Sequence, residues 1–315
     1  SGASKELIAL VEKTGIPVAS TLLGLGAFPA DHPNYVGFLG MHGNYGPNLN
    51  TNECDVLIGL GMRFDDRVTG NVNRYAKQAK IIHIDIDKAE INKVIKADVA
   101  IHADAKEALQ ALIGACNENN HEEWLQSFHK LNQVEYEKVT HRELNHPLND
   151  LKMGEVINHL SKMTNGEAIV VTDVGQHQMT TSRYYKYKNP RTNVTSGGAG
   201  TMGFALPAAL GAKLAMPDKQ VVAVIGDGGY QMTVQELGTI MQYEIPVKIM
   251  VLNNSFLGMV RQWQQLFHEK RYSSTEMVNP NFIKIAEAYN IPARKVEKRE
   301  DLQGAIREML EAKTA

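Results

Sequence analysis

Apolar runs of five or six residues that alternate with longer helical patterns restrict the fold of this sequence most strongly. The runs predict strands at 16–20, 55–60, 81–85, 168–172, 221–225, 247–252 and 291–296. Amphipathic patterns predict helices at 4–14, 106–115, 153–163, 203–215, 234–242, 280–289 and 301–312. Near-continuous apolar strands separated by helices are typical of parallel sheets that are covered on both faces. The predicted fold class is therefore α/β, with two doubly wound parallel-sheet domains.

A polar, charge-rich segment between residues 117 and 150 interrupts this alternation. It predicts one long helix from His121 to Leu144, after which Pro147 and Asn149-Asp150 end the helical pattern. We therefore predict a first domain at 1–118, a linker helix at 119–149 and a second domain at 150–315. The length of 315 residues suits two domains, because a domain commonly holds about 100–200 residues.

Composition and charge argue against several classes of partner. The net charge of −2 gives no basic surface for nucleic acid. No apolar run approaches the ~18–20 residues of a membrane span, and the first residues lack the pattern of a signal peptide. Cys54 and Cys116 lie too far apart in sequence to indicate a disulfide framework. These features fit a reducing compartment, and the cytoplasm if the protein is bacterial.

Glycines at positions 198, 200 and 203 have the G-x-G-x-x-G spacing of dinucleotide-binding folds. That motif needs a strand before it, a helix after it, and an acid about 20 residues on at the end of a second strand. Only the helix is clear here, because Asp218 lies in a turn before a strand. We expect no nicotinamide site, although the glycines indicate that another group approaches the backbone closely.

Asp227 follows the apolar run 221–225 and is flanked by glycines, a pattern that a tight turn also explains. Asn253 and Asn254 follow the next apolar run, and Asn254 comes 27 positions after Asp227. That distance is about one βαβ unit, which brings both strand ends to one edge of the sheet. Carboxylate and amide oxygens suit Mg²⁺ or Ca²⁺, and Mg²⁺ commonly completes its coordination with water and phosphates. The spacing therefore predicts a metal-bridged diphosphate close to glycine amides.

The pattern Gly-Asp-Gly followed by Asn-Asn resembles the signature of thiamine-diphosphate enzymes. Longer stretches resemble the large catalytic subunit of the acetolactate synthases, also called acetohydroxyacid synthases. They are "STLLGLGAFPADHP" (20–33), "LGMHG" (39–43), "GMRFDDRVTGN" (61–71), "HIDIDKAEINK" (83–93), "DVGQHQM" (173–179), "TSGGAGTMGFALPAALGAK" (195–213) and "NNSFLGMVRQWQ" (253–264). The resemblance runs in order over nearly the whole chain. It implies an N-terminally truncated central domain of the FAD-binding type at 1–118 and a C-terminally truncated thiamine-diphosphate domain at 150–315.

The resemblance also implies an activity, cofactors and partners. Such an enzyme is a transferase that decarboxylates pyruvate and ligates the hydroxyethyl unit to a second pyruvate or to 2-ketobutyrate. This is the first common step of branched-chain amino acid biosynthesis. Thiamine diphosphate, Mg²⁺ and FAD are the implied cofactors. A homodimer or homotetramer and a small regulatory subunit are the implied assembly of the intact protein.

The same resemblance assigns roles to residues of the second domain. The metal ligands would be Asp227, Asn254 and the backbone carbonyl of Phe256. Met202 would lie under the thiazolium ring of the cofactor. The residues expected to bind thiamine diphosphate are Val174, Gly175, Gln176, His177, Gly200, Met202, Asp227, Gly228, Gly229, Asn254, Leu257, Gly258 and Met259.

A second set of residues would bind FAD and the ketoacids. The ketoacid substrates would meet Met41, Arg67, Met259 and Trp263, with Trp263 favouring 2-ketobutyrate over pyruvate. The residues expected at FAD are Thr21, Leu22, Leu23, Leu39, Gly40, Met41, His42, Gly61, Met62, Arg63, Asp65, Arg67, Val68, Asp85, Ile86, Asp87, Glu90, Asp98, Val99, Gln178 and Met179.

Two alternative functions remain open, and the resemblance also implies that one domain of the family is missing. Another thiamine-diphosphate carboligase or a pyruvate oxidase shares the core motif, although "RFDDR" and "VRQWQ" favour the FAD-containing biosynthetic enzymes. A non-catalytic cofactor-binding module is the second alternative. Family members begin with a further domain whose glutamate activates the cofactor, and no counterpart precedes Ser1. We therefore name no certain catalytic residue and expect residues 1–315 alone to be inactive.

Overall fold

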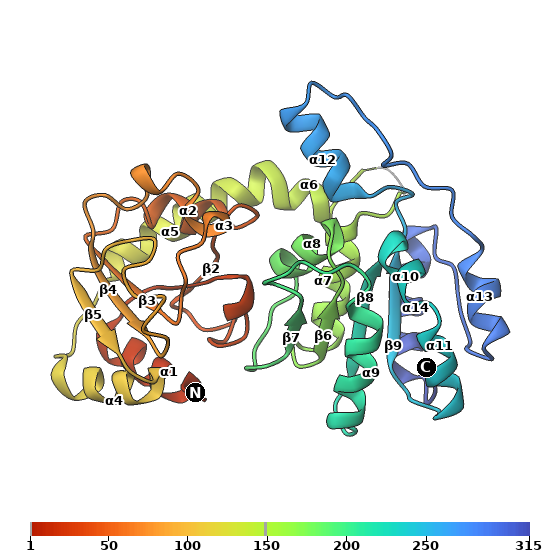
Figure 1. The fold of residues 1–315 in the computed structure, drawn as a ribbon, viewed down its shortest axis with the longest axis horizontal. Coiled ribbons are helices and arrows are strands. Elements are labelled where there is room, and N and C mark those ends of the chain that lie inside the picture. Colours follow the sequence, from red (N-terminus) through yellow and green to blue (C-terminus); the bar gives the residue numbers. More distant parts are fainter. Residues whose placement is uncertain (1, 148–149) are drawn as a thin grey trace. The chain divides into compact units, whose positions relative to one another are not determined.

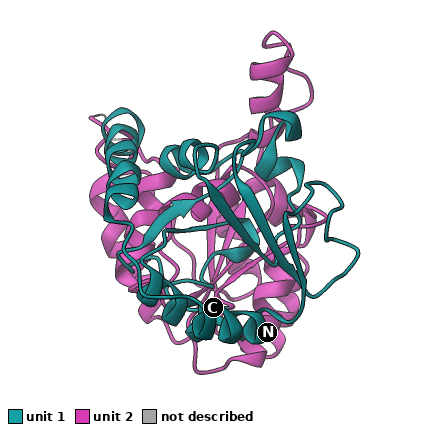
Figure 2. Ribbon diagram, turned by 90° about the vertical axis from the view of Figure 1, so that its left-hand side faces the viewer, with its two compact units in different colours: residues 1–141, 188–190 teal, residues 142–187, 191–315 magenta. Residues whose placement is uncertain are grey.

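The computed structural model describes residues 2–147 and 150–315, and the chain forms two compact units. Unit 1 comprises residues 1–141 and 188–190, and unit 2 comprises residues 142–187 and 191–315 (Figure 2). The predicted end of the linker at residue 149 lies outside the described residues. Among the described residues, no helix has the length and apolar character needed to cross a membrane.

Unit 1 contains two small sheets in which every strand pair is parallel. One sheet has the order β1-β2 and the other β3-β4-β5. The strands are β1 (Val18–Ser20), β2 (Tyr35–Phe38), β3 (Val56–Leu60), β4 (Lys80–Asp85) and β5 (Val99–His102). The α-helices are α1 (Ser4–Thr14), α2 (Tyr45–Asn50), α3 (Asp66–Thr69), α4 (Ala105–Ala115) and α5 (Glu122–Glu135), with 3₁₀ turns at Leu22–Gly24 and Val72–Arg74.

The strand orders of unit 1 match the two halves of the doubly wound order 2-1-3-4-5, in which β1 and β3 are neighbours. Among the described residues β1 and β3 belong to separate sheets and are not paired with each other. β3 is therefore an edge strand, and its side chains Val56 and Ile58 are exposed although the strand is apolar throughout. Val56 and Ile58 point to the same face of the sheet, so this face is not covered at β3, whereas apolar parallel strands are normally covered on both faces.

The predicted linker helix is part of unit 1 as far as His141. Helix is continuous from Glu122 to Leu144, through α5, a π-helical turn at Tyr136–Thr140 and α6 (His141–Leu144). Leu125 and Phe128 of α5 form a buried cluster with Val36 of β2. The predicted long helix from residue 121 to 144 is confirmed, and its first half contributes to the core of unit 1.

Unit 2 has one parallel four-stranded sheet with the order β7-β6-β8-β9 (Figure 1). The strands are β6 (Ile169–Thr172), β7 (Asn193–Thr195), β8 (Val221–Gly226) and β9 (Lys248–Leu252). The helices are α7 (Met153–Met163), α8 (Gln176–Tyr184), α9 (Ala205–Ala215), α10 (Asp227–Met232), α11 (Glu236–Gln242), α12 (Gly258–Phe267), α13 (Phe282–Ala288) and α14 (Arg299–Glu311). The predicted α/β class with parallel sheets is confirmed.

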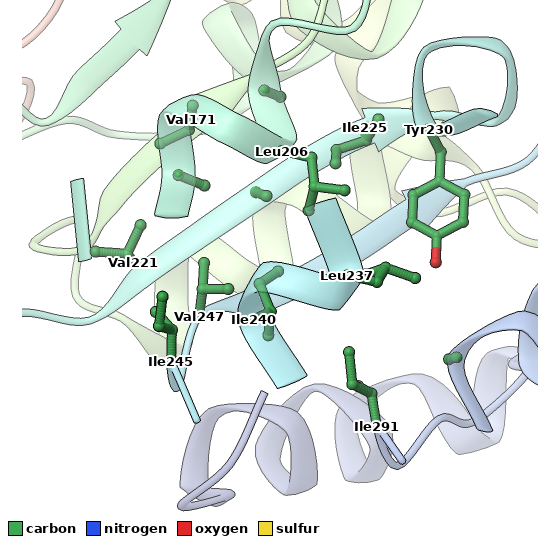
Figure 3. Close-up of a cluster of buried hydrophobic side chains, with 14 of the residues drawn as sticks. Val171, Leu206, Val221, Ile225, Tyr230, Leu237, Ile240, Ile245, Val247 and Ile291 are labelled. Carbon is green, nitrogen blue, oxygen red and sulfur yellow. The ribbon is translucent and has the colours of Figure 1, made fainter. Parts of the chain in front are cut away.

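The core of unit 2 lies on one face of β6 and β8 (Figure 3). Side chains of alternate strand residues, among them Val171 and Ile225, pack there against Leu206 of α9 and Leu237 of α11. The intervening residues of both strands are buried as well, because they lie on the opposite face, which is also covered. Strands buried on both faces explain the unbroken apolar runs of the sequence.

The predicted strand at 291–296 is wrong, because the structure has no regular secondary structure there. Ile291 is buried, but Pro292 and the three residues after it are exposed. A proline has no N–H to give to a neighbouring strand. Three strands were missed instead, namely β2, β5 and β7, which are three or four residues long.

Candidate functional site

Asp227 and Asn254 lie at the carboxyl ends of neighbouring strands. β8 pairs with β9, and Gly226 is the register partner of Leu252. Asp227 follows β8 directly, and Asn253-Asn254 follows β9 directly. The prediction that these two strand ends meet at one edge of a sheet is confirmed.

Hydrogen bonds tie the Asp227 carboxylate to the loop that carries Asn254. Oδ2 accepts from the backbone N–H of Ser255 at 2.8 Å and from Nδ2 of Asn279 at 2.7 Å. Oδ1 accepts from the N–H of Gly228 at 3.1 Å. Asp227 is 2% exposed, and none of the ion pairs among the described residues includes it. A buried carboxylate without a cationic partner is costly, so this charge is suited to a bound cation.

The oxygen donors beside Asp227 fit a small divalent cation. Oδ1 of Asn254 accepts from the N–H of Phe256 at 3.1 Å, and its Nδ2 donates to Oε1 of Gln176 at 3.3 Å. A carboxylate offers about four acceptor positions and an amide oxygen two, so each group keeps one for a metal. No cluster of three or more His, Cys, Asp or Glu was found in the described part of the chain. One carboxylate, one amide and a carbonyl instead match Mg²⁺ that shares its coordination with water and a phosphate.

A pocket of about 410 Å³, counted with its opening to solvent, lies beside these groups in unit 2. It brings together twelve of the thirteen residues expected at thiamine diphosphate, and Phe256. Gly200 is the one that does not line it. The full lining is Met153, Val174, Gly175, Gln176, His177, Met202, Gly226, Asp227, Gly228, Gly229, Leu252, Asn254, Phe256, Leu257, Gly258, Met259 and Val260.

His177 lies buried at this pocket between two glycines. A Cβ on Gly175 or Gly226 would come within 2.9 or 2.8 Å of its ring carbon Cε1. Its Nε2 has no hydrogen-bond partner among the described residues. Burial lowers the pKa of His177 to about 4, against the opposing effect of the Asp173 and Asp227 charges. The ring is therefore neutral at pH 7 and keeps one nitrogen available to a ligand.

The lowered pKa of His177 predicts a pH-dependent loss of stability. Between pH 6.5 and about 4 the unfolded chain binds a proton that the folded chain does not. The free energy of unfolding of unit 2 therefore decreases as the pH falls through this range. One pKa unit corresponds to about 1.4 kcal/mol, so the step from pH 6.5 to 5 removes about 2 kcal/mol. Urea unfolding of the cofactor-free chain at pH 7 and pH 5 measures the loss. The His177→Gln variant should lose clearly less, and an equal loss in both proteins would contradict this explanation.

Several residues of the site were not predicted, among them Asp173, Met153 and Asn279, and of these three only Asp173 left a signal in the sequence. Asp173 follows the apolar run of β6, the same signal that identified Asp227. Met153 lines the pocket from the first turn of α7. Asn279 lies in a loop with no strand before it, yet its Nδ2 also donates to Oδ1 of Asn253 at 3.0 Å. Sequence spacing gives no means of finding such a residue.

In unit 1 most of the residues expected at FAD lie at the carboxyl ends of the strands. The N–H of Leu39 donates to the Ser20 carbonyl at 2.8 Å, which joins the ends of β2 and β1. The N–H of Met41 donates to the Arg67 carbonyl at 2.7 Å, which joins the loop after β2 to α3. The loops at 39–42 and 61–68 are therefore in contact, as a shared ligand site requires.

Two of the expected FAD residues lie at the other end of the sheet. Asp98 and Val99 are at the start of β5, and Asp98 Oδ2 accepts from the N–H of Ile81 at 2.9 Å. The amino ends of parallel strands share one edge, so Asp98 is separated from the loops that follow β3 and β4. Gln178 and Met179 are on α8 of unit 2, where Gln178 Nε2 donates to Thr195 Oγ1 at 2.7 Å.

The charged run 63–67 is paired within itself. Arg63 lies 3.0 Å from Asp65 and Arg67 lies 2.8 Å from Asp66. Asp65 also accepts from the Arg67 N–H and so caps α3. Both ion pairs are exposed, so they contribute little to stability and can open for a ligand.

The four residues expected at the ketoacid substrates fall in both units. Met41 and Arg67 lie together in unit 1, through the backbone hydrogen bond already described. Met259 and Trp263 are both on α12 of unit 2. Met259 lines the pocket, whereas Trp263 does not and packs against Phe267 with ring centroids 4.8 Å apart.

Known protein families match both units. The central domain of thiamine pyrophosphate enzymes matches residues 1–112, and the C-terminal TPP binding domain of these enzymes matches residues 173–315. The second match contains the whole predicted metal site and the pocket residues from Val174 to Val260. The family expected from the Gly-Asp-Gly and Asn-Asn motif is confirmed.

Similar proteins include acetolactate synthases from bacteria and plants. The large subunit from Lactococcus lactis is 47% identical over 94% of this chain and 51% of its own length. Acetolactate synthase 1 of Nicotiana tabacum is 46% identical over 99% of this chain and 48% of its own length. The isozyme 3 large subunit of Escherichia coli is 41% identical over 99% of this chain and 55% of its own length.

This chain therefore spans about half the length of the curated relatives it matches. The two matched domains follow each other in the order central, then C-terminal. The chain belongs to the thiamine pyrophosphate enzymes and is similar along its length to acetolactate synthases.

Proposed function

We propose that this chain carries the thiamine-diphosphate site of an acetolactate synthase. The observation that carries the proposal is the meeting of Asp227 and Asn254 at adjacent strand ends, beside a pocket with glycine amides. The activity would join the hydroxyethyl unit of a decarboxylated pyruvate to a second pyruvate or to 2-ketobutyrate, with release of carbon dioxide. Similarity to acetolactate synthases over 94–99% of the chain supports this reaction over that of a pyruvate oxidase.

Each group of the pocket has a defined task in this proposal. Asp227, Asn254 and the Phe256 carbonyl would hold Mg²⁺, which neutralises the diphosphate. Gly228, Gly229 and the unpartnered Nε2 of His177 would hydrogen-bond the diphosphate oxygens. Met202 and Leu257 supply apolar surface that excludes water from the reacting end. Thiamine diphosphate supplies the electron sink for the loss of carbon dioxide.

Acetolactate formation by the protein extended to the full length of its relatives tests the proposal. We expect pyruvate to be converted when thiamine diphosphate, Mg²⁺ and FAD are all supplied. Conversion of pyruvate to acetyl phosphate or acetaldehyde without acetolactate would replace this function by that of another thiamine-diphosphate enzyme. The 315 residues span about half the length of these relatives, and we expect them to show no turnover when they are assayed alone.

We also propose that unit 1 binds FAD at the loops after β1 to β4. The contact between the loops at 39–42 and 61–68 supports this position, as does the resemblance of "GMRFDDRVTGN" to FAD-containing members. Asp85 and Asp87 follow β4, where acids can bind ribose hydroxyls. The flavin absorbance of the purified full-length protein, lost on substitution of Arg63, tests this assignment.

Trp263 should influence which ketoacid is accepted. An apolar pocket discriminates one methylene by about 1–3 kcal/mol, so Trp263→Leu should lower the preference for 2-ketobutyrate about tenfold. Competition between 2-ketobutyrate and pyruvate in the full-length enzyme measures the product ratio. Leu266→Ala is a suitable control, because Leu266 is an exposed side chain on the same helix. An unchanged product ratio in the Trp263 variant would remove this role.

The assembly is proposed on the same grounds. Relatives from Lactococcus lactis and Escherichia coli are named large subunits, which supports a smaller regulatory partner for this protein. A homodimer or homotetramer of the intact protein stays a prediction from the family resemblance. A cytoplasmic location, if the source is bacterial, also stays a prediction.

A further inference from the structure

Asp173 is a buried carboxylate to which neither the family resemblance nor the proposed reaction assigns a role. It follows β6 and is 0% exposed. Its Oδ1 accepts from the N–H of Val174 at 2.9 Å and of Gly203 at 3.1 Å, and its Oδ2 accepts from the N–H of Ala205 at 3.0 Å. A Cβ on Gly229 would come within 2.4 Å of Oδ1, so that backbone also packs directly on the carboxylate.

Two of the amides that Asp173 binds, those of Gly203 and Ala205, lie at the start of α9. The first N–H groups of a helix have no partner within the helix and attract anions. Asp173 places its own negative charge there, against the positive end of an eleven-residue helix. An anion from within the chain therefore already occupies the helix end that a nucleotide phosphate would use in a dinucleotide-binding motif.

The position of α9 determines where Met202 lies. Met202 directly precedes Gly203, whose φ of +81° turns the chain into the helix. A Cβ on Gly228 would lie 3.5 Å from Met202 Cε, so Met202 faces the glycines that follow Asp227. The carboxylate of Asp173 thus contacts Val174 and Gly229, which line the pocket. It also contacts Gly203, which directly follows the pocket residue Met202.

We propose that Asp173 is a positioning residue of the cofactor pocket. Its carboxylate fills the N-terminus of α9 and holds Met202 and Gly229 in the arrangement that receives thiamine diphosphate. Asp173 does not line the pocket, so it acts through these residues and not by contact with the cofactor. The inference rests on the proposed function of the pocket.

The test compares Asp173→Asn with a matched buried carboxylate. Asparagine keeps the size of the side chain but has one accepting oxygen in place of two, so one backbone amide loses its partner. With saturating Mg²⁺, the dissociation constant for thiamine diphosphate should rise about tenfold, because a hydrogen bond to a charged group is lost. The control is Glu155→Gln, since Glu155 is 5% exposed and pairs with Arg299 at 2.8 Å without lining the pocket.

A second variant separates positioning from general stability. Asp173→Ala empties the helix end, and formate supplies a carboxylate of the missing size. Formate should strengthen thiamine diphosphate binding to Asp173→Ala and leave the wild-type chain and Glu155→Gln unchanged. An Asp173→Asn affinity within twofold of wild type, or equal losses in Asp173→Asn and Glu155→Gln, would overturn the inference while the proposed function stands. Failure of the wild-type protein to bind, when extended to the full length of its relatives, would instead remove the proposed function.

Discussion

Replacement of Asp227 by Asn is expected to abolish metal-dependent binding of thiamine diphosphate, with a loss of affinity of at least about 100-fold. The substitution keeps the size of the side chain but removes its charge and one accepting oxygen. The one accepting oxygen that remains is shared by three donors, namely the N–H groups of Ser255 and Gly228 and the side-chain amide of Asn279. A neutral amide binds Mg²⁺ far less strongly than a carboxylate, because Mg²⁺ is a hard cation. Calorimetric titration with thiamine diphosphate, with and without Mg²⁺, measures the loss.

Asp218→Asn is the matched control for this variant. Asp218 is an exposed acid of the same unit, in the turn before β8. Its substitution changes the net charge equally but should leave the affinity unchanged, because exposed charges beyond a Debye length are screened. If Asp227→Asn still binds the cofactor with a Mg²⁺ requirement like that of the wild-type chain, Asp227 is not a metal ligand.

Replacement of Leu237 by Ala is expected to give the largest loss of stability in unit 2, about 3 kcal/mol. Leu237 is 0% exposed and packs in the main core against strand and α9 side chains (Figure 3). Truncation of a buried leucine costs about 2–5 kcal/mol, since apolar contacts are lost and a cavity remains. Urea unfolding followed by Trp263 fluorescence in a Trp124→Phe background reports on unit 2, because the chain has one tryptophan in each unit.

Leu214→Ala provides the comparison for the core variant. Leu214 is on α9 but is 62% exposed, so its truncation should change the free energy of unfolding by less than about 0.5 kcal/mol. The slope of the transition with urea should be the same for both variants, because the surface exposed on unfolding is similar. A loss below about 1 kcal/mol for Leu237→Ala would show that the core relaxes around the missing side chain.

The strands with unbroken apolar runs were the easiest to predict from the sequence. β6, β8 and β9 lie within one residue of their predicted starts, and α1 and α7 begin and end where predicted. In the strands the apolar run itself is the signal, because a strand covered on both faces needs it. β5 and β7 are edge strands with exposed or half-buried residues, so their pairing depends on the neighbouring strand more than on their own side chains. The prediction at 291–296 shows the opposite error, because this apolar run forms no strand in the structure.

The site was predictable where its residues follow strands. The distance between Asp227 and Asn254 reflects the length of one βαβ unit, which the fold imposes. Asp173 has the same position after β6, but a single acid at a strand end is not distinguishable from a turn residue. Its role depends on α9, whose first residue, Ala205, reaches it from 32 positions further along the chain. Asn279 binds Asp227 from a loop 52 positions away, and no periodicity encodes that contact.

A crystal structure with thiamine diphosphate and Mn²⁺ in place of Mg²⁺ tests the central claim most directly, since anomalous scattering locates the metal. We predict one metal bound octahedrally by Asp227, Asn254 and the Phe256 carbonyl, with its remaining positions taken by diphosphate oxygens and water. The diphosphate should lie beside Gly228 and His177. A metal bound elsewhere, or a diphosphate seated at the N-terminus of α9 in place of the Asp173 carboxylate, would contradict the account.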